Sequence, residues 1–284
     1  MNPNENRKQI INECINYIIE RMENSEEEFS VEQIAEQFHF SKYYFNRMFR
    51  EETGESVYAF VKRRKLDQSA IDIKLEKDRT ITEIGSSYGY SSSNYSSAFS
   101  SHHQISPARF RENTDTGDLR SPFFPEESEV AKTFEEYEAE IQIQDIQDSF
   151  VLYERVIGNY LELGEKWSSF LKKYWEQIGS ETVMIERFYN DPAVTGQSHC
   201  ICDLCITVSP SCLEKNTTVI PGGRFAVYRF EGAVRDIYYA LQGVFFVWLP
   251  ESGYHMDGLC AMNRYLRMDN EQGFVSMELC IPIK

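Results

Sequence analysis

An internal repeat limits what this chain can fold into more than any other feature of its sequence. Residues 31–50 and 81–100 align at a constant offset of 50 positions. The shared positions are core-forming residues or caps: Ile34 with Ile84, Ala35 with Gly85, Phe38 with Tyr88, Phe40 with Tyr90, Ser41 with Ser91, Phe45 with Tyr95, and Phe49 with Phe99. Apolar residues spaced three and four apart share one face of a helix. Each copy is therefore predicted to form the same arrangement of packed helices.

Local signals place two helices in each copy. Ser30 and Thr80 each precede a helical pattern and have a Gln or Glu three residues on, which is the capping-box spacing. A small residue in the first helix of each copy allows close approach of the second, as in a helix-turn-helix. The serine-rich stretch 91–104 is then a second helix, N-capped by Ser91, and not a linker. A plain helical bundle is the alternative, but it does not explain the same spacing of cap, small residue and core in both copies.

The second helix of each copy is the expected DNA-reading element. In a helix-turn-helix its non-core positions enter the major groove of double-stranded DNA. In the first copy these positions are Lys42, Tyr43, Asn46, Arg47 and Arg50, and in the second they are Ser92, Ser93, Ser96, Ser97 and Ser100. The helix predicted between the copies, over 56–75, spans about 30 Å. Reading helices enter successive major grooves about 34 Å apart, so one chain is expected to reach two adjacent turns of a duplex.

Residues 8–112 resemble the DNA-binding domain of the AraC/XylS family of bacterial transcription regulators. The resemblance is carried by "SVEQIAEQFHFSKYYFNRMFREETG" and by "ITEIGSSYGYSSSNYSSAFSSHHQISPARFR", which ends in the family's Pro-x-x-[Phe/Tyr]-Arg. It implies that the first reading helix makes most base contacts, here through Tyr43, Asn46 and Arg47. Arg47 is the strongest candidate, because an arginine can form two hydrogen bonds to one guanine.

Charge distinguishes the two reading helices and the two halves of the chain. The family usually carries an arginine and lysines where this chain has Ser97, Ser100 and Ser101, and serines bond phosphates without adding charge. The net charge of -16 is uneven: residues 1–115 hold 15 Lys and Arg against 19 Asp and Glu, and residues 116–284 hold 14 against 26. The first half also clusters its basic residues, as in Lys62–Lys65. Net acidity therefore does not exclude DNA binding by the first half.

The second half carries a repeat of its own. Phe150-x-x-Tyr153 followed by Gly158 is matched by Phe225-x-x-Tyr228 followed by Gly232. Each copy continues into a helical stretch, at 160–178 and 234–249, and then into two strand-like segments, at 182–189 and 199–208 and at 259–268 and 274–283. Two β-α-β-β repeats predict one α+β domain with its helices on one side of an antiparallel sheet. Through "IPGGRFAVYRFEG", "WLPESGY" and "ELCIPIK" this half resembles the GyrI-like ligand-binding domain.

Two domains follow from these patterns. We predict an all-α double helix-turn-helix DNA-binding domain at 1–112 and an α+β GyrI-like domain at 135–284. The linker predicted between them, 113–134, is polar, contains Gly and Pro, and has an acidic run at 126–129. This order of domains resembles the right-origin-binding group of regulators.

The second resemblance implies a ligand pocket between the two repeats. In the family the pocket is lined by aromatic residues and holds a glutamate that meets cationic organic ligands. That glutamate lies two residues before a tyrosine, a position that here is Asn263 before Tyr265. Trp167 and Trp248 are candidates for the pocket or the core, and Asn263 and Tyr265 are equally interpretable as plain strand residues. Because an amide carries no charge, we expect a neutral or hydrogen-bonding small-molecule effector, and no enzyme activity of the kind that relatives derive from this glutamate. If a lipophilic cation binds instead, another acid such as Glu186 or Asp203 carries the charge, or the alignment of this strand is wrong.

The segment "HCICDLC", His199 to Cys205, suggests metal binding at first sight. In a strand, however, Asp203 and Cys205 face one side while Cys200 and Cys202 face the other. Closed zinc sites typically combine two pairs of cysteines, each pair separated by two to four residues. This sequence contains that spacing in one segment only. No metal and no cofactor is therefore expected, and a sensing role of Cys200, Cys202 and Cys205 stays open. The pair His102-His103 is expected to cap a helix or lie at the surface.

A cytoplasmic transcription regulator is the function that these patterns favour. The first residues contain no apolar signal segment, and the longest uncharged apolar stretch, Ile237–Pro250, is shorter than the roughly 20 residues that cross a membrane. Seven cysteines, an odd number, are typical of reduced thiols. RNA polymerase is a candidate partner. The alternatives are a second domain that binds another protein without a ligand, or a hydrolase-like enzyme with a DNA-binding appendage.

Overall fold

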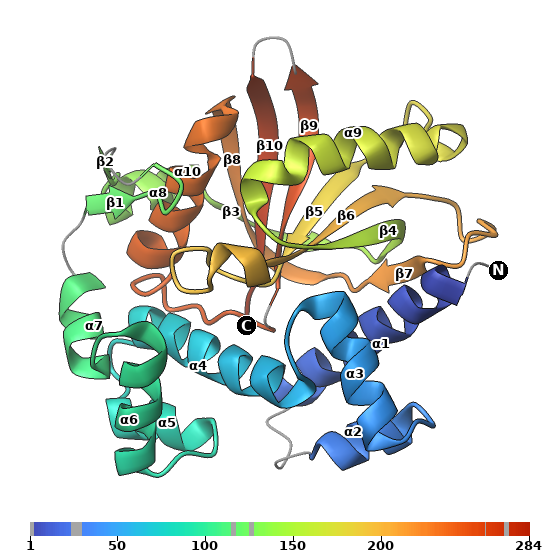
Figure 1. The fold of residues 1–284 in the computed structure, drawn as a ribbon. Helices are drawn as coiled ribbons and strands as arrows, with labels where there is room; N and C mark the ends of the chain where they lie inside the picture. Colours follow the sequence, from blue (N-terminus) through green and yellow to red (C-terminus); the bar gives the residue numbers. More distant parts are fainter. Residues whose placement is uncertain (1–2, 24–29, 115–117, 125–127, 259, 270–272) are drawn as a thin grey trace. The chain divides into compact units, whose positions relative to one another are not determined.

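The computed structural model describes residues 3–23, 30–114, 118–124, 128–258, 260–269 and 273–284 (Figure 1). The chain divides into two units, Met1–Asp115 and Thr116–Lys284. Parts of the predicted linker (115–117 and 125–127) and position 259 of a predicted strand lie outside the described residues. No helix that the model describes is long and apolar enough to cross a membrane.

The first unit is helical, and it contains the two predicted helix-turn-helix motifs. The first is α2 followed by α3, and the second is α5 followed by α6, with α4 between the two. The helices described in this unit are α1 (Pro3–Glu23), α2 (Val31–Gln37), α3 (Lys42–Thr53), α4 (Val57–Leu75), α5 (Ile81–Ser87), α6 (Ser92–His103) and α7 (Pro107–Thr114). The all-α double helix-turn-helix prediction is therefore confirmed.

Capping hydrogen bonds define where these helices begin. The capping boxes predicted at Ser30 and Thr80 are both present, with each side chain and each backbone N–H engaged. Gly54 ends α3 in the left-handed conformation at φ 81°, which favours glycine. Ser41 accepts from the backbone N–H of Tyr44 at the start of α3. Ser91 is the N-cap residue of α6, as predicted, but its side chain makes no capping hydrogen bond.

The small residue in the first helix of the second motif, Gly85, has the predicted role. A Cβ placed on Gly85 would lie 2.6 Å from Cγ of Tyr95. Real carbon atoms do not approach so closely, so α5 and α6 pack at this distance only with glycine. The ring of Tyr95 is held on its other side, because its hydroxyl donates to Oγ of Ser69 on α4 over 2.9 Å.

We therefore expect Gly85→Ala to destabilise the first unit, by about 1–3 kcal/mol, the usual cost of overpacking a core. The matched control is Gly164→Ala, because Gly164 also lies in a helix but has open space around its Cβ position. There the better helix propensity of alanine should stabilise by about 0.5–1 kcal/mol. Thermal unfolding of the two variants measures both changes, and a stable Gly85→Ala variant would contradict the packing described here.

The two motifs attach to α4 by different chemistry. Where the first copy has Phe38 and Phe45, the second has Tyr88 and Tyr95. The hydroxyl of Tyr88 donates to Oδ2 of Asp72 over 2.7 Å, as the hydroxyl of Tyr95 does to Ser69. The second motif is thus held to α4 by hydrogen bonds that the first copy cannot make.

Contrary to what the sequence suggested, the basic cluster Lys62–Lys65 on α4 is not a wholly exposed group of cations. Arg63 and Arg64 are buried, with 8% and 2% of the surface of the whole residue exposed. They belong to the interior of the unit and cannot add to a DNA-facing surface. The hydrophobic pattern of 56–75 predicted the helix itself, but not that one buried face would be polar.

Burial raises the pKa of Asp72 to about 6, from an ordinary value of 3.8, although the hydrogen bond from Tyr88 partly offsets the rise. A carboxyl whose pKa is raised by folding is most stabilising while protonated, and its contribution is lost as pH rises through the folded pKa. This contribution should therefore fall between about pH 4 and pH 6 and stay low above pH 6.

Asp72→Asn should for that reason stabilise the chain by about 1–3 kcal/mol at pH 7–8 and by little at pH 4. Asparagine keeps an acceptor for Tyr88 but never ionises. The control is Asp78→Asn, because Asp78 is exposed. Thermal unfolding of the three proteins at pH 4, 6 and 8 measures the difference. A gain that is the same at every pH would show that ionisation of Asp72 is not its source.

The second unit is built on an antiparallel sheet that joins the two predicted β-α-β-β repeats. The strands run in the order β3-β8-β10-β9-β5-β6-β4-β7. Their bounds are β3 (Gln142–Ile146), β4 (Ser149–Ile157), β5 (Met184–Phe188), β6 (Ile201–Thr207), β7 (Thr217–Ile220), β8 (Gly223–Ala233), β9 (Ala261–Asp269) and β10 (Phe274–Pro282). The repeats are β4-α9-β5-β6 and β8-α10-β9-β10, and they meet where β5 pairs with β9.

Helices α9 (Leu163–Lys173) and α10 (Ile237–Gly243) lie on the same face of this sheet. Figure 1 shows α9 in front of the strands. Trp167 and Phe170 of α9 and Leu241 of α10 share one core cluster with Leu152 of β4 and Met277 of β10. The α+β prediction, with its two repeats and one helical layer, is confirmed.

The stretch predicted as a linker contains short elements of its own. Strands β1 (Asp118–Arg120) and β2 (Ser128–Val130) pair antiparallel, and α8 (Phe134–Glu140) follows with a complete capping box at Thr133. Within the predicted linker, the ring of Phe123 lies edge-on to Tyr238 at a centroid distance of 5.7 Å, and Nε2 of Gln197 donates to the carbonyl oxygen of Pro122 over 3.0 Å. Part of this stretch therefore packs within the second unit. Polar composition and prolines did not indicate that packing.

Candidate DNA-reading surface and effector site

The first reading helix, α3, presents a row of polar and aromatic side chains to solvent. Tyr43 is the most exposed of them, with 81% of its surface accessible, and Lys42, Arg47 and Arg50 are exposed as well. The core residues Phe45, Met48 and Phe49 hold the opposite face of α3 in the unit.

Asn46 differs from the other predicted reading residues. Its side-chain oxygen accepts from the backbone N–H of Val57 over 3.1 Å, at the start of α4. The residue is half-buried. This contact ties α3 to the first turn of α4, so Asn46 has a structural partner in the protein, whatever it contacts on DNA.

Carboxylates accompany the cations of this surface. Nζ of Lys42 pairs with Glu32 of α2, and Nε of Arg47 lies 3.9 Å from Glu51, which also pairs with Arg7 of α1 at 3.2 Å. The hydrogen bond from Lys42 lowers the pKa of Glu32. Exposed pairs of this kind are weak, so DNA phosphates can replace the carboxylates as partners of Lys42 and Arg47.

The second reading helix, α6, presents serines instead. Ser92, Ser93, Ser96 and Ser97 are exposed and Ser100 is half-buried. The helix contains no lysine or arginine. The exposed side chains of α3 and α6 therefore differ in charge, as predicted. Which of them contact DNA stays a prediction.

We expect Arg47→Ala to weaken binding to a specific duplex by about 1–3 kcal/mol and to relax the preference at one base pair. Ser97→Ala should cost much less, because a serine contact to phosphate carries no charge. Ser97→Arg should tighten binding with a steeper dependence on salt. Gel-shift titrations of the three variants at several salt concentrations decide this, and equal losses for Arg47→Ala and Ser97→Ala would contradict the ranking.

In the second unit, three predicted residues converge on a carboxylate. Nε1 of Trp167 donates to Oε1 of Glu186 over 2.6 Å, and the hydroxyl of Tyr265 donates to Oε2 over 2.7 Å. Asn263 of β9 stands directly opposite Glu186 of β5 in the sheet. The four side chains come from α9, β5 and β9, and so from both repeats.

Burial controls the electrostatics of this cluster. At most 8% of the surface of Trp167, Glu186, Asn263 and Tyr265 is exposed. Burial raises the pKa of Glu186, although hydrogen bonds from Tyr265, Trp167 and Asn263 oppose the rise. Burial and the adjacent carboxylate raise the pKa of Tyr265 well above its usual value. The donors around Glu186 are an indole, a phenol and an amide, all of them neutral.

Asn263 brings an unsatisfied acceptor to the same place. Its Oδ1 is buried without a hydrogen-bond partner in the part of the chain that the model describes. An unpaired buried acceptor costs free energy unless a donor reaches it. A ligand with an N–H or O–H group could supply that donor.

Trp248 does not join this cluster. It lies in the π-helical segment Val244–Trp248 that continues α10, and its Nε1 donates to Oε2 of Glu138 on α8 over 2.6 Å. Its ring stacks on Tyr254 at a centroid distance of 6.2 Å. The core interpretation suits this tryptophan, which is 1% exposed.

Sequence reasoning placed the acid's position at Asn263 and held Glu186 only as an alternative, although the repeat contained the signal for Glu186. Residues 185–188, Ile-Glu-Arg-Phe, correspond to residues 262–265, Met-Asn-Arg-Tyr. The rule that places a glutamate two residues before an aromatic thus finds Glu186 in the first repeat and Asn263 in the second. Because β5 and β9 pair at the centre of the sheet, either position delivers an acid to the same cluster.

The cysteines of "HCICDLC" lie on opposite faces of β6, as the strand register predicted. Cys202 packs in the cluster under α9, and Cys205 packs in the cluster on the other face. Burial raises the pKa of both thiols well above the usual value. All seven cysteines are free thiols. Raised pKa values keep Cys202 and Cys205 protonated, and therefore poor nucleophiles and poor metal ligands, near neutral pH.

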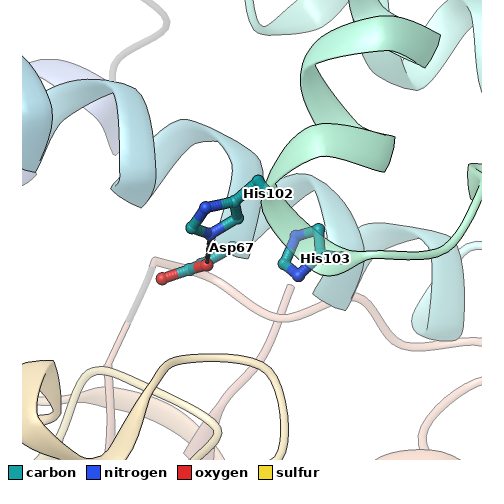
Figure 2. A group of neighbouring side chains, drawn as sticks. All are labelled: Asp67, His102 and His103. Carbon is teal, nitrogen blue, oxygen red and sulfur yellow. Dashed lines mark hydrogen bonds and ion pairs between the residues drawn. The ribbon is translucent and has the colours of Figure 1, made fainter.

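Within the described ranges, the side chains with metal-ligand spacing are Asp67 of α4 and His102 and His103 of α6, whose candidate ligand atoms lie within 4.8 Å of one another. Figure 2 shows His102 directed at Asp67, with a dashed line between them, and His103 beside them. Nε2 of His102 lies 2.8 Å from Oδ1 of Asp67. These histidines were expected to cap a helix or to lie at the surface. His102 does lie at the surface, and its ring also contacts the buried Asp67, so that it joins α6 to α4.

A helix-turn-helix pair and an α+β domain with a buried polar cluster define a DNA-binding regulator that carries a small-molecule-binding domain. Residues 139–284 match the family described as GyrI-like small molecule binding domain, and residues 34–113 match a helix-turn-helix domain family. The chain belongs to the GyrI-like family, and its DNA-binding domain is of the AraC type.

Known proteins resemble parts of this chain. The probable transcription factor PqrA of Proteus vulgaris is 29% identical over 105 residues, which cover 37% of this chain and 84% of PqrA. The multiple antibiotic resistance protein MarA of Escherichia coli K12 is 29% identical over 99 residues, covering 34% and 77%. The EcmrR–DNA complex, solved by cryo-electron microscopy, is 10% identical, covers 90% of this chain and 85% of that one, and has a TM-score of 0.42.

Proposed function

We propose that this regulator responds to a small molecule that binds at Glu186. The convergence of Trp167 and Tyr265 on a carboxylate that is 8% exposed carries this proposal. The cluster lies between the two repeats, where the resemblance implied a pocket, and it combines aromatic surface with a few directed polar groups, as ligand sites do. Because these side chains are buried, we expect them to move when a ligand enters.

The chemistry of the cluster favours a cationic aromatic ligand. Asn263 alone predicted a neutral effector, but Glu186 opposite it supplies the negative charge that the amide lacks. A buried carboxylate surrounded by neutral donors gains most from a positive partner. The free oxygen of Asn263 can accept a hydrogen bond from the same ligand. An anionic ligand would be repelled.

For the DNA-binding unit we propose that α3 reads bases and that α6 mainly contacts phosphates. Exposed Tyr43 and Arg47 on α3, and the serines of α6, support this division. We further propose that the chain acts in the cytoplasm, and that RNA polymerase is the partner through which DNA binding changes transcription.

Binding without catalysis is the proposed role of the second unit. Covalent hydrolysis at this cluster would need a nucleophilic side chain near Glu186. The neighbouring Cys202 and Tyr265 both have pKa values raised well above their usual range, so neither ionises readily at neutral pH. The carboxylate itself is already engaged by hydrogen-bond donors.

The test is titration of the full chain with tetraphenylphosphonium, a lipophilic aromatic cation, and with neutral triphenylphosphine oxide, followed by calorimetry and tryptophan fluorescence. The cation should bind more tightly. Its affinity should rise with pH, because Glu186 ionises only above its usual range. Glu186→Gln should weaken cation binding by about tenfold or more, the effect of losing one buried charge contact.

Glu154→Gln is the matched control, because Glu154 faces the same layer but pairs with Lys173 at the edge of the cluster. It should leave the affinity unchanged. Equal binding of the cation and the neutral oxide, or full cation affinity in Glu186→Gln, would overturn the assignment of Glu186. Absence of binding by both probes would favour the protein-interaction role for the second unit.

A further inference from the structure

A continuous row of ion-paired and hydrogen-bonded side chains runs through α4. Glu55 lies just before α4, and its carboxylate accepts from Nη2 of Arg63 over 2.6 Å and from Nε over 3.0 Å. Nη1 of Arg63 donates to Oδ2 of Asp67 over 3.1 Å. The other oxygen of Asp67, Oδ1, lies 2.8 Å from Nε2 of His102 on α6 (Figure 2). The row is therefore Glu55–Arg63–Asp67–His102.

The inner members of the row are buried. The side chains of Arg63 and Asp67 are 9% and 5% exposed, and that of Glu55 is 12% exposed. Buried ions need partners, and removal of one partner leaves the other uncompensated. The two oxygens of Asp67 point to different elements, one to Arg63 and one to His102. The row is therefore a unit in which each pair depends on the next.

The ends of the row lie at the two reading helices. Glu55 directly follows Gly54, the residue that ends α3, and precedes the N-cap Ser56 of α4. His102 lies in the last turn of α6. Between them, Arg63 and Asp67 are one turn apart on the helix that connects the motifs. The row thus connects the end of one reading helix to the end of the other.

We propose that this charge row is a positioning device for DNA recognition, one that sets α3 and α6 at the angle and spacing needed to enter two successive major grooves. Apolar contacts such as Phe49 with Phe60 hold the first motif on α4, but apolar packing tolerates small rotations that directed ion pairs do not. A small rotation of α6 about α4 would leave α3 seated on its half-site and move α6 out of the next groove. None of the four residues needs to touch DNA for this role.

A metal ion at Asp67, His102 and His103 is a different possibility that the same side chains raise. Two contacts argue against it. Arg63, a cation, already occupies one oxygen of Asp67, and Nε2 of His103 lies 3.3 Å from the carbonyl oxygen of Leu66. Burial and the adjacent His102 lower the pKa of His103, so His103 is a neutral neighbour of the row.

The test compares one long duplex with two short ones. The wild-type full chain selects a duplex from a random-sequence pool, and hydroxyl-radical footprinting identifies its two protected segments. Two further duplexes each keep one segment. Binding to all three is measured for Glu55→Gln and Asp67→Asn, with Glu52→Gln and Asp78→Asn as matched controls, since both control residues are exposed.

If the row positions the helices, Glu55→Gln and Asp67→Asn should bind the long duplex about tenfold more weakly, one tenfold step being about 1.4 kcal/mol. They should lose protection of one segment and bind the short duplexes as the wild type does, and the controls should bind all three normally. His102→Gln, which keeps a donor for Asp67, should retain more affinity than His102→Ala. Thermal unfolding shows whether each variant is folded under the assay conditions.

Equal losses on the long and short duplexes, or no loss on any, would overturn the proposal. A metal effect would also overturn it. If Zn²⁺ raises the affinity of the wild type for the long duplex, and His103→Ala abolishes that increase, the cluster is a metal site. The inference rests on the proposed reading by α3 and α6, which Arg47→Ala tests separately in the same assay. Unchanged binding by Arg47→Ala would count against α3 as the reading helix, whatever the row variants do.

Discussion

The DNA-binding unit depends on how α4 is buried. This helix contacts both helix-turn-helix motifs, and it buries polar side chains, Arg63, Asp67 and Ser69, inside the unit. Charged and hydroxyl groups are costly to bury without partners and directional when they have them. Each motif is therefore attached to α4 at defined points as well as by apolar packing. Two reading helices on one chain are useful only if their separation is fixed, and α4 is the element that can fix it.

The two motifs have diverged around the same framework. Both keep the capping residue, the small residue and the aromatic core, but the second exchanges phenylalanines for tyrosines and basic surface residues for serines. The tyrosine hydroxyls reach Ser69 and Asp72, so this motif is attached more firmly by polar contacts. Its reading helix meanwhile contains no lysine or arginine. This pattern suits a motif that supports binding while α3 provides base recognition.

The second unit places one acid between its two repeats. A pseudo-symmetric sheet offers two equivalent positions, Glu186 on β5 and Asn263 on β9, and they face each other across one pair of strands. Either position can hold the negative charge. If the acid is expected only in the second repeat, the residue found there is the amide Asn263, and the predicted ligand is neutral. The hydrogen bonds from Trp167 and Tyr265 show which position carries the acid here. An effector that engages Glu186 would displace buried side chains. Binding of the effector would therefore change the conformation of the second unit.

Local and periodic features were determined by the sequence itself. The repeats, the capping boxes at Ser30 and Thr80, the need for a small residue at Gly85 and the strand order within each β-α-β-β unit all follow from spacing and residue type, because they depend on neighbours a few residues apart. Only the tertiary structure decided which polar residues meet. The burial of Arg63, the approach of Asp67 to His102, the convergence on Glu186 and the separation of Trp248 from Trp167 each join residues distant in the chain. Periodicity shows which face of an element is buried, but not which distant side chain lies against it.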